Sequence, residues 1–137
     1  MARYVLDEQI GFVLRQAQQR HTTLFAAEMI DGLTPTQWAA LAKLRECGAC
    51  SQNHLGRLTA MDAATIKGVI DRLTARGFTL ARADPADARR LLVELTDEGV
   101  ALYARAVPMA QAITEKTLEK LAEEERALLV GLLRRLT

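Results

Sequence analysis

Basic side chains are concentrated between residues 57 and 90 of this 137-residue chain, and their positive charge could bind an anionic partner. Seven lysines and arginines lie between residues 57 and 90, against four acids in the same interval. From Glu94 onward the balance reverses, with eight acids and six bases, so the net charge is only +1. Because ammonium and guanidinium groups neutralise phosphates, this distribution suits a nucleic-acid-binding surface, although most charged faces are simply solvated.

The segment 62–75 is predicted to be a helix with one apolar and one polar face. Asp62 suits the N-cap, and Gly77 suits the position after the helix. The inward face repeats at helical period: Ile66, Val69, Ile70 and Leu73. The outward face carries groups that can reach base edges or phosphates in a major groove, and a glycine that lets the backbone come close: Thr65, Lys67, Gly68 and Arg72. Ala64, Asp71 and Ala75 complete that face.

A charged hairpin is predicted to follow, with strands over 78–82 and 91–95 joined by a turn over 83–90. Asp87 stands two residues before Arg89, and a carboxylate there can orient the guanidinium through a charge-assisted hydrogen bond. An arginine held in this way suits a narrow minor groove, where the negative potential is strongest. Arg82 is expected to reach a phosphate, with Arg90 on the same surface. The alternative is an ordinary polar turn with a weak surface salt bridge.

Two further helices are needed to position these groups. Thr34-Pro35-Thr36-Gln37 is a helix start with a capping box, and that helix is expected to stop near Gly48. Ser51 is expected to cap a short third helix, and Ser51 and Gln52 join the predicted DNA-contacting residues. This helix, a turn near Ala60 and the helix from Asp62 form a helix-turn-helix.

Long apolar helices flank this unit. Residues ~6–30 follow helical spacing up to Gly32, and a helical run from Thr96-Asp97 towards Thr117 contains Pro108, where a kink is expected. The last helix is expected to carry Leu118, Leu121, Leu128, Leu129, Leu132 and Leu133. These helices are more apolar than a domain of ~60 residues needs, which favours a dimer interface over a monomeric helical cap.

The fold class is therefore mainly α, an α+β winged helix-turn-helix. Residues 34–96 would form the DNA-binding domain, and residues 1–33 with 97–137 the dimerisation region. We expect no enzyme activity, catalytic residue or cofactor, because no phosphate-binding glycine loop or activated nucleophile is present and Glu123-Glu124-Glu125 resembles a solvated charge run. The absence of a signal-peptide pattern or bilayer-length apolar run favours the cytoplasm and no membrane partner.

The order and spacing of these landmarks resemble the MarR family of winged helix-turn-helix regulators over residues ~34–102. The matching residues include Asp62-x-x-Thr65, Gly77-Phe78, Arg82-x-Asp84-Pro85-x-Asp87-x-Arg89 and Leu92-x-x-Leu95-Thr96-x-x-Gly99. The resemblance implies a homodimer that binds double-stranded DNA at a pseudo-palindromic operator and usually represses nearby genes. It also implies that 62–75 is the recognition helix and Arg89 the wing-tip arginine. Thr79-Leu80-Ala81 departs from the basic residues common in the family's first wing strand.

The resemblance further implies a small aromatic or phenolic acid, or its thioester, as an effector that releases DNA. His21 and Trp38 are the candidates, because an imidazole and an indole at a domain junction could hold a carboxylate and a ring. The alternative is that both are packing residues.

Cys47-Gly48-Ala49-Cys50 leaves a second regulatory hypothesis open. A C-x-x-C pair in a reducing compartment can be a redox pair, so a thiol-responsive DNA-binding regulator is an alternative to a ligand-responsive one. His54 adds only a third ligand, so we expect no metal site. The cysteines are most simply small residues in a turn. A winged-helix protein-interaction module without DNA binding is the remaining alternative.

Overall fold

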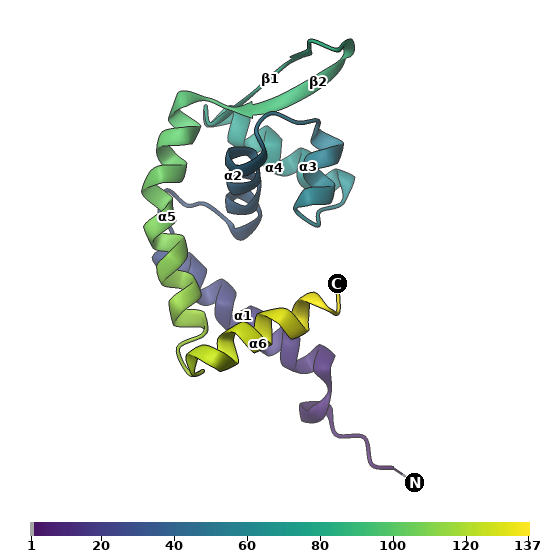
Figure 1. Ribbon diagram of the computed structural model, residues 1–137, viewed down its shortest axis with the longest axis vertical. Coiled ribbons are helices and arrows are strands. Elements are labelled where there is room, and N and C mark those ends of the chain that lie inside the picture. The colour runs from purple at the N-terminus through teal and green to yellow at the C-terminus, as the bar shows by residue number, and fades with distance from the viewer. Residues whose placement is uncertain (1) are drawn as a thin grey trace.

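The computed structural model describes residues 2–137, which form six α-helices, a short 3₁₀ helix and a two-stranded antiparallel sheet (Figure 1). This architecture confirms the predicted mainly α winged helix-turn-helix class. The elements follow in the order 3₁₀ (Leu6–Glu8), α1 (Ile10–Glu28), α2 (Pro35–Cys47), α3 (Gln52–Leu58), α4 (Ala63–Ala75), β1 (Thr79–Asp84), β2 (Asp87–Leu95), α5 (Asp97–Thr117) and α6 (Glu123–Arg134).

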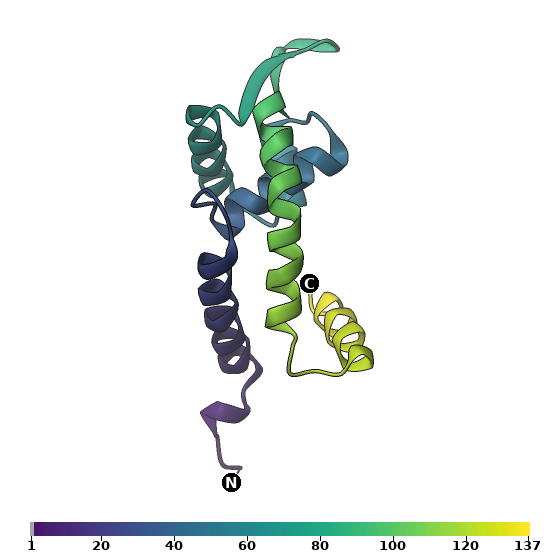
Figure 2. The same ribbon diagram turned by 90° about the vertical axis from the view of Figure 1, so that its left-hand side faces the viewer.

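Helix α5 connects the two parts of the molecule. At one end it continues from β2, beside the cluster of α2, α3 and α4 from which the hairpin projects (Figure 1). Its other end packs along α1, and α6 then turns back from it (Figure 2). The hairpin and the N-terminus therefore lie at opposite ends of the molecule.

The predicted helix starts are confirmed by their capping hydrogen bonds. The Thr34 hydroxyl accepts from the Gln37 backbone N–H at 3.3 Å, while the Gln37 side chain accepts from the Thr34 N–H at 3.2 Å. Ser51 and Asp62 cap α3 and α4 by accepting from the backbone N–H groups of His54 and Thr65, without a reciprocal side-chain hydrogen bond. These local bonds satisfy backbone donors that would otherwise lack partners, and they determine where each helix begins.

The core holds α4 in one rotational setting. Its predicted apolar stripe is buried: Ile66, Val69, Ile70 and Leu73. The stripe packs in one cluster with Leu41 of α2, Leu55 of α3 and Leu102 of α5. Because the inward face of α4 is fully occupied, the opposite face must point outward.

The hairpin is longer than the sequence predicted, and Pro85-Ala86 alone form its turn. Ala83 pairs with Leu91 and Asp84 pairs with Asp87, so residues 88–90 form a bulge with no opposing residue on β1. The Asp84 carboxylate accepts from the Ala86 N–H at 2.9 Å, which closes the turn locally. The expected turn over 83–90 was wrong because Asp84 and Asp87, a residue type with low strand propensity, nevertheless pair with each other in the ladder.

The flanking helices also differ in detail from expectation. Helix α1 ends at Glu28, and Gly32 lies in a following turn with φ +64°. Leu118 and Leu121 lie in the connection before α6 rather than within the last helix. Helix α5 runs through Pro108 as one helix, although proline lacks the N–H for the i−4 hydrogen bond.

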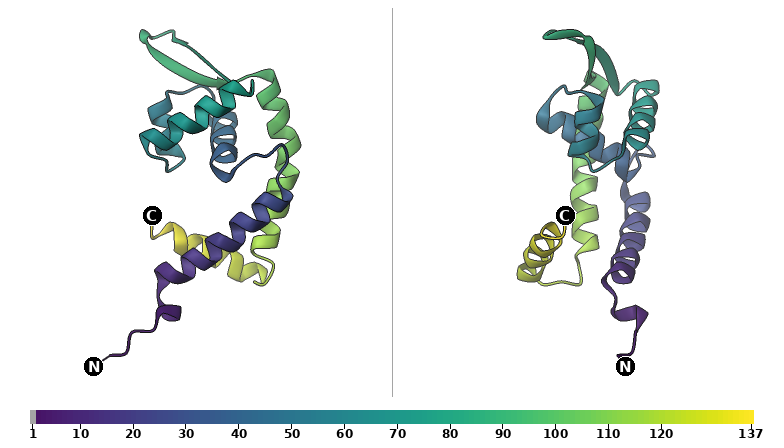
Figure 3. Two further views of the ribbon diagram at one scale, coloured as in Figure 1. Left: turned by 180° about the vertical axis from the view of Figure 1, so that it is seen from behind. Right: turned by 90° about the vertical axis from the view of Figure 1, so that its right-hand side faces the viewer.

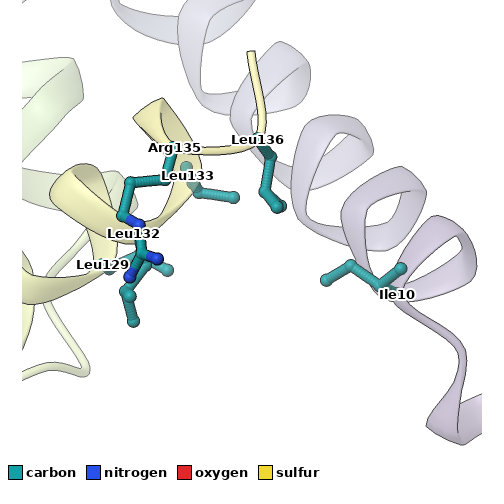
Figure 4. Close-up of a pocket in the computed structure, with 6 residues that line it drawn as sticks. All are labelled: Ile10, Leu129, Leu132, Leu133, Arg135 and Leu136. Carbon is teal, nitrogen blue, oxygen red and sulfur yellow. The ribbon is translucent and has the colours of Figure 1, made fainter.

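Apolar side chains on α1 and α6 remain exposed. Ile10 is 62% exposed and Leu128 is 61% exposed, and no residue within Glu123–Arg134 is buried. An apolar groove runs between the two helices and the C-terminus (Figure 4), lined by Ile10, Leu129, Leu132, Leu133, Arg135 and Leu136. Within residues 2–137 no helix combines the length and the hydropathy required to cross a bilayer.

We predict that Gly99→Ala destabilises the fold at the junction of the hairpin and α5. An added Cβ would lie 2.1 Å from the Phe78 carbonyl oxygen, so the backbone must shift. Overpacking of this kind costs about 1–3 kcal/mol, and thermal unfolding should show Tm lowered by several degrees. The control is Gly68→Ala, whose Cβ would lie 3.5 Å from an Arg72 nitrogen, an ordinary contact. An unchanged Tm for Gly99→Ala would contradict the close packing.

Candidate nucleic-acid interface

The outward face of α4 presents the predicted polar residues to solvent. Thr65, Lys67 and Arg72 are exposed and Gly68 is half-buried. Asp62 caps this helix by accepting from the Thr65 N–H at 2.7 Å, and this hydrogen bond lowers the pKa of its carboxyl group. Helix α4 itself lies below the hairpin in the view from behind (Figure 3).

Two contacts organise the charges on this face. The Lys67 ammonium donates to the Asp71 carboxylate at 2.8 Å, so an acid lies among the candidate DNA-contacting groups. The Arg72 guanidinium lies back over Gly68, where a Cβ would be 3.5 Å from its Nη1. An alanine Cβ at position 68 would make only an ordinary contact with this guanidinium.

The hairpin presents Arg89 from its bulge. The Asp87 carboxylate accepts both from the Arg89 backbone N–H at 3.1 Å and from its Nε at 3.3 Å. The Arg89 side chain is 93% exposed, so this pair adds little to stability. The carboxylate instead orients a guanidinium that is otherwise free in solvent. The structure brings the predicted pair together, but on β2 rather than in a turn.

Ser51 connects the start of α3 to the β1–β2 hairpin, residues 79–95, which we call the wing. Arg90 Nη2 donates to the Ser51 hydroxyl at 3.1 Å. Together they line a polar hollow with Gln52, Asn53, Arg57 and Leu91. Arg57 was not among the predicted contact residues, although its place on a seven-residue helix that begins at Gln52 puts it one turn from that start.

Arg82 is less available to a phosphate than predicted. Its Nε donates to the Glu94 carboxylate at 2.9 Å, diagonally across the hairpin. The ion pair offsets part of its charge, although the other guanidinium N–H groups can still donate. Arg89, whose side chain is 93% exposed, is therefore more available than Arg82, whose side chain is 41% exposed.

A short bridge attaches the base of the wing to the helix-turn-helix. The Cys50 N–H donates to the Val93 carbonyl at 3.1 Å, and the Val93 N–H donates to the Cys50 carbonyl at 2.8 Å. Cys47 is exposed, whereas Cys50 is buried, and burial raises the pKa of the Cys50 thiol. A raised thiol pKa reduces the thiolate fraction and hence the reactivity of Cys50. Within residues 2–137 no group of three or more His, Cys, Asp or Glu is arranged to hold a metal ion.

The structure does not bring His21 and Trp38 together within one chain. Thr117 donates its hydroxyl to the Ile113 carbonyl, so His21 Nδ1 donates to that hydroxyl, at 2.8 Å. The Trp38 indole instead stacks on Tyr103, with centroids 5.3 Å apart and planes 9° from parallel. Thr117 lies about four turns beyond Tyr103 on α5, roughly 20 Å along its axis.

A hollow between α2 and α5 accompanies the stacked pair. It is lined by Trp38, Tyr103, Val107, Ala110, Gln111 and Thr114, which combine an aromatic wall with amide and hydroxyl groups. Such a lining can hold a planar ring and orient its polar substituents. The hollow therefore lies where α2, a helix of the DNA-binding domain predicted over 34–96, faces α5, which packs on α1 further along.

Comparison with known proteins identifies similar chains. Residues 33–91 match the model of the MarR family. The Pseudomonas putida HTH-type transcriptional repressor NicR is 41% identical over 97% of this chain and 85% of its own length. A probable transcriptional regulator from Pseudomonas aeruginosa superposes with a TM-score of 0.95 at 55% identity, covering 97% of this chain and 100% of that one.

A third similar protein has a regulated DNA-binding activity. It is BpsR of Bordetella bronchiseptica, whose DNA binding is regulated by 6-hydroxynicotinic acid. It superposes with a TM-score of 0.94 at 43% identity, and the match covers 98% of this chain and 97% of BpsR.

We predict that Arg89→Ala weakens binding to duplex DNA from upstream of the protein's own gene by about tenfold. Because the Arg89 side chain is 93% exposed, its loss would remove one contact to a phosphate or to the minor groove and would lower the salt slope by about 0.9. Fluorescence anisotropy at several salt concentrations measures both quantities.

Two variants serve as controls for Arg89. Asp87→Ala keeps the Arg89 guanidinium but frees its orientation; because it also removes one acid from the surface, we expect a smaller loss of affinity than for Arg89→Ala. Arg3→Ala makes the same charge change at an exposed residue of the segment before the 3₁₀ helix, and should leave affinity unchanged. That segment lies at the end of the molecule opposite the hairpin (Figure 1). If Arg89→Ala binds as tightly as the unmodified protein, the wing does not contact DNA.

Proposed function

Because this chain belongs to the MarR family, we propose that it is a homodimeric, sequence-specific DNA-binding repressor of transcription. One observation carries the proposal: the outward face of α4 and the oriented Arg89 belong to one folded unit, joined through the Cys50–Val93 bridge and the Arg90–Ser51 hydrogen bond. A helix and an arginine presented in this way suit a major groove and the adjoining minor groove.

We assign DNA binding and dimerisation to the two regions predicted from the sequence. Residues 34–96 would bind DNA, while residues 1–33 and 97–137 would form the dimer. Exposed apolar groups on α1 and α6 support the second assignment, since an uncovered groove of this kind is typical of a subunit interface. A two-fold dimer would present two recognition helices to half-sites about 34–36 Å apart, hence a pseudo-palindromic operator.

The proposed effector is a small aromatic acid that releases DNA. The hollow beside Trp38 and Tyr103 offers an aromatic wall at the junction of the winged unit and α5. Regulation of BpsR by 6-hydroxynicotinic acid supports this chemical class. A ligand that binds better to one arrangement of α2 and α5 would shift the spacing of the two recognition helices. We prefer the free acid to its thioester, because 6-hydroxynicotinic acid, which regulates BpsR, is a free aromatic acid.

The thiol-responsive alternative has less support. Of the two cysteines that it would need, Cys50 is buried. Its backbone pairs with Val93 and its side chain lies in the core. Peroxide that releases DNA from the unmodified protein but not from Cys47→Ser would favour that alternative. Failure to bind any duplex would favour a protein-interaction module instead.

We predict that Leu132→Glu converts a dimer to a monomer. Leu132 lines the apolar groove, and a carboxylate there would be desolvated in the interface. Size-exclusion chromatography with light scattering measures the mass, and operator affinity should fall by about a hundredfold or more because the two half-sites no longer bind together. Leu132→Met conserves the volume and should remain dimeric. A Leu132→Glu protein with the mass of a dimer would contradict the assignment.

We predict that 6-hydroxynicotinic acid or a related hydroxylated aromatic acid quenches the fluorescence of Trp38. Trp38 is the single tryptophan of the chain, so its emission reports directly on the hollow. The same titration should raise Tm through binding to the folded state and should displace the upstream duplex in anisotropy measurements. Cyclohexanecarboxylic acid, which has the carboxylate without the aromatic ring, is the matched negative ligand.

Variants separate the effector site from the DNA-binding surface. Tyr103→Ala should lose the response to the acid and still bind duplex DNA. His21→Ala tests whether the effector also reaches α1. His21 contacts Thr117, which lies about four helical turns from Tyr103 along α5. A panel of aromatic acids and one aromatic thioester that changes neither fluorescence nor Tm would refute the proposed effector class.

A further inference from the structure

An acidic side chain lies at the centre of the surface proposed to face DNA. Asp71 is on the outward face of α4, and its side chain is 60% exposed. Close to phosphates a carboxylate is repelled, so an acid in this position weakens binding unless it finds a donor. In the major groove such donors exist only on bases.

The structural value of Asp71 to the helix is small. Its partner Lys67, with a side chain 66% exposed, precedes it by four residues, and exposed pairs contribute little to stability. The order lysine then acid is also the less favourable one for an i,i+4 pair. Helix stabilisation therefore gives a weak reason for an aspartate at this position.

The pair has the donor and acceptor pattern of one base-pair edge. Lys67 Nζ and Asp71 Oδ2 lie 2.8 Å apart. In a C·G pair the cytosine N4 amine, a donor, and the guanine O6, an acceptor, are neighbours in the major groove, joined by a hydrogen bond of about 2.9 Å. A carboxylate opposite N4 and an ammonium opposite O6 or N7 would match both groups at that spacing.

Other bases match the carboxylate poorly. Guanine and thymine present acceptors in the major groove, which repel it. Adenine presents its N6 amine beside the N7 acceptor, whereas the cytosine amine has no neighbouring acceptor on its own base. Asp71 therefore favours cytosine and penalises the alternatives.

We infer that the Lys67–Asp71 pair reads one C·G base pair in each half-site. The inference rests on the proposed DNA-binding function. The Asp71 carboxylate accepts from cytosine N4, and the Lys67 ammonium donates to O6 or N7 of the paired guanine. Asp71 is thus a specificity-determining residue that reduces affinity for unmatched DNA.

Selection from a random-sequence duplex library tests this inference without knowledge of the operator. The unmodified protein should enrich a two-fold motif with a C·G pair at one position of each half-site. Asp71→Ala should lose the preference at that position alone and should bind random duplex more tightly, with a salt slope steeper by about 0.9. Asp71→Asn should shift the preference towards adenine, because an amide both donates and accepts.

Quantitative binding to the selected duplex sharpens the test. Replacing the C·G pair should weaken the unmodified protein by about 5- to 100-fold, and should weaken Asp71→Ala by less than about threefold. A double-mutant cycle of Lys67→Ala and Asp71→Ala should show coupling on the C·G duplex and none on the replaced duplex. Glu119→Ala is the matched control, because it also removes an acid from an exposed ion pair, with Arg20, but at the α5–α6 connection.

The results separate the inference from the function on which it rests. If the unmodified protein enriches a motif and Asp71→Ala enriches the same motif with undiminished preference at every position, the inference is overturned and the function stands. A uniform loss of affinity on all duplexes, with a lowered Tm, would also overturn it, because Asp71 would then act on the helix. If the unmodified protein enriches no motif, both fail.

Discussion

The burial of one face of α4 is the constraint on which the rest of the DNA-binding unit depends. Ile66 and Leu73 are fully buried among side chains of α2, α3 and α5, so α4 cannot rotate without opening the core. This packing selects which residues face outward, and Lys67, Asp71 and Arg72 are exposed as a consequence. The orientation of this face is therefore set by apolar residues that do not lie on it.

The wing depends on the same core through its backbone. Val93 pairs with Cys50 on one side and with Ala81 on the other, so the base of the hairpin is held between two partners. Beyond it the register shifts, and residues 88–90 leave the ladder. A bulge of this kind re-aims a side chain, and here it directs Arg89 outward while Asp87 holds its Nε.

The sequence predicted the features that depend on neighbouring residues. The capping box at Thr34 and the cap at Asp62 are decided within one turn, and the apolar stripe of α4 is visible as a period. The bulge and the Arg82–Glu94 pair depend on the register of two strands, which residue types alone do not determine. The separation of His21 from Trp38 depends in turn on the length of α5, against which both pack.

Contacts at Asp31 connect α5, which lines the hollow beside Trp38, to the end of α4. Arg105 of α5 donates to the Asp31 carboxylate at 3.3 Å, and Arg76, the C-cap of α4, donates to its backbone carbonyl at 2.7 Å. The start of α5 is also tied to the residue that follows the C-cap of α4, because the Thr96 hydroxyl donates to the Gly77 carbonyl at 2.6 Å. Any shift of α5 relative to α2 therefore acts on the C-terminal end of α4. An effector need only prefer one arrangement by about 1–3 kcal/mol to change DNA affinity about 5- to 150-fold.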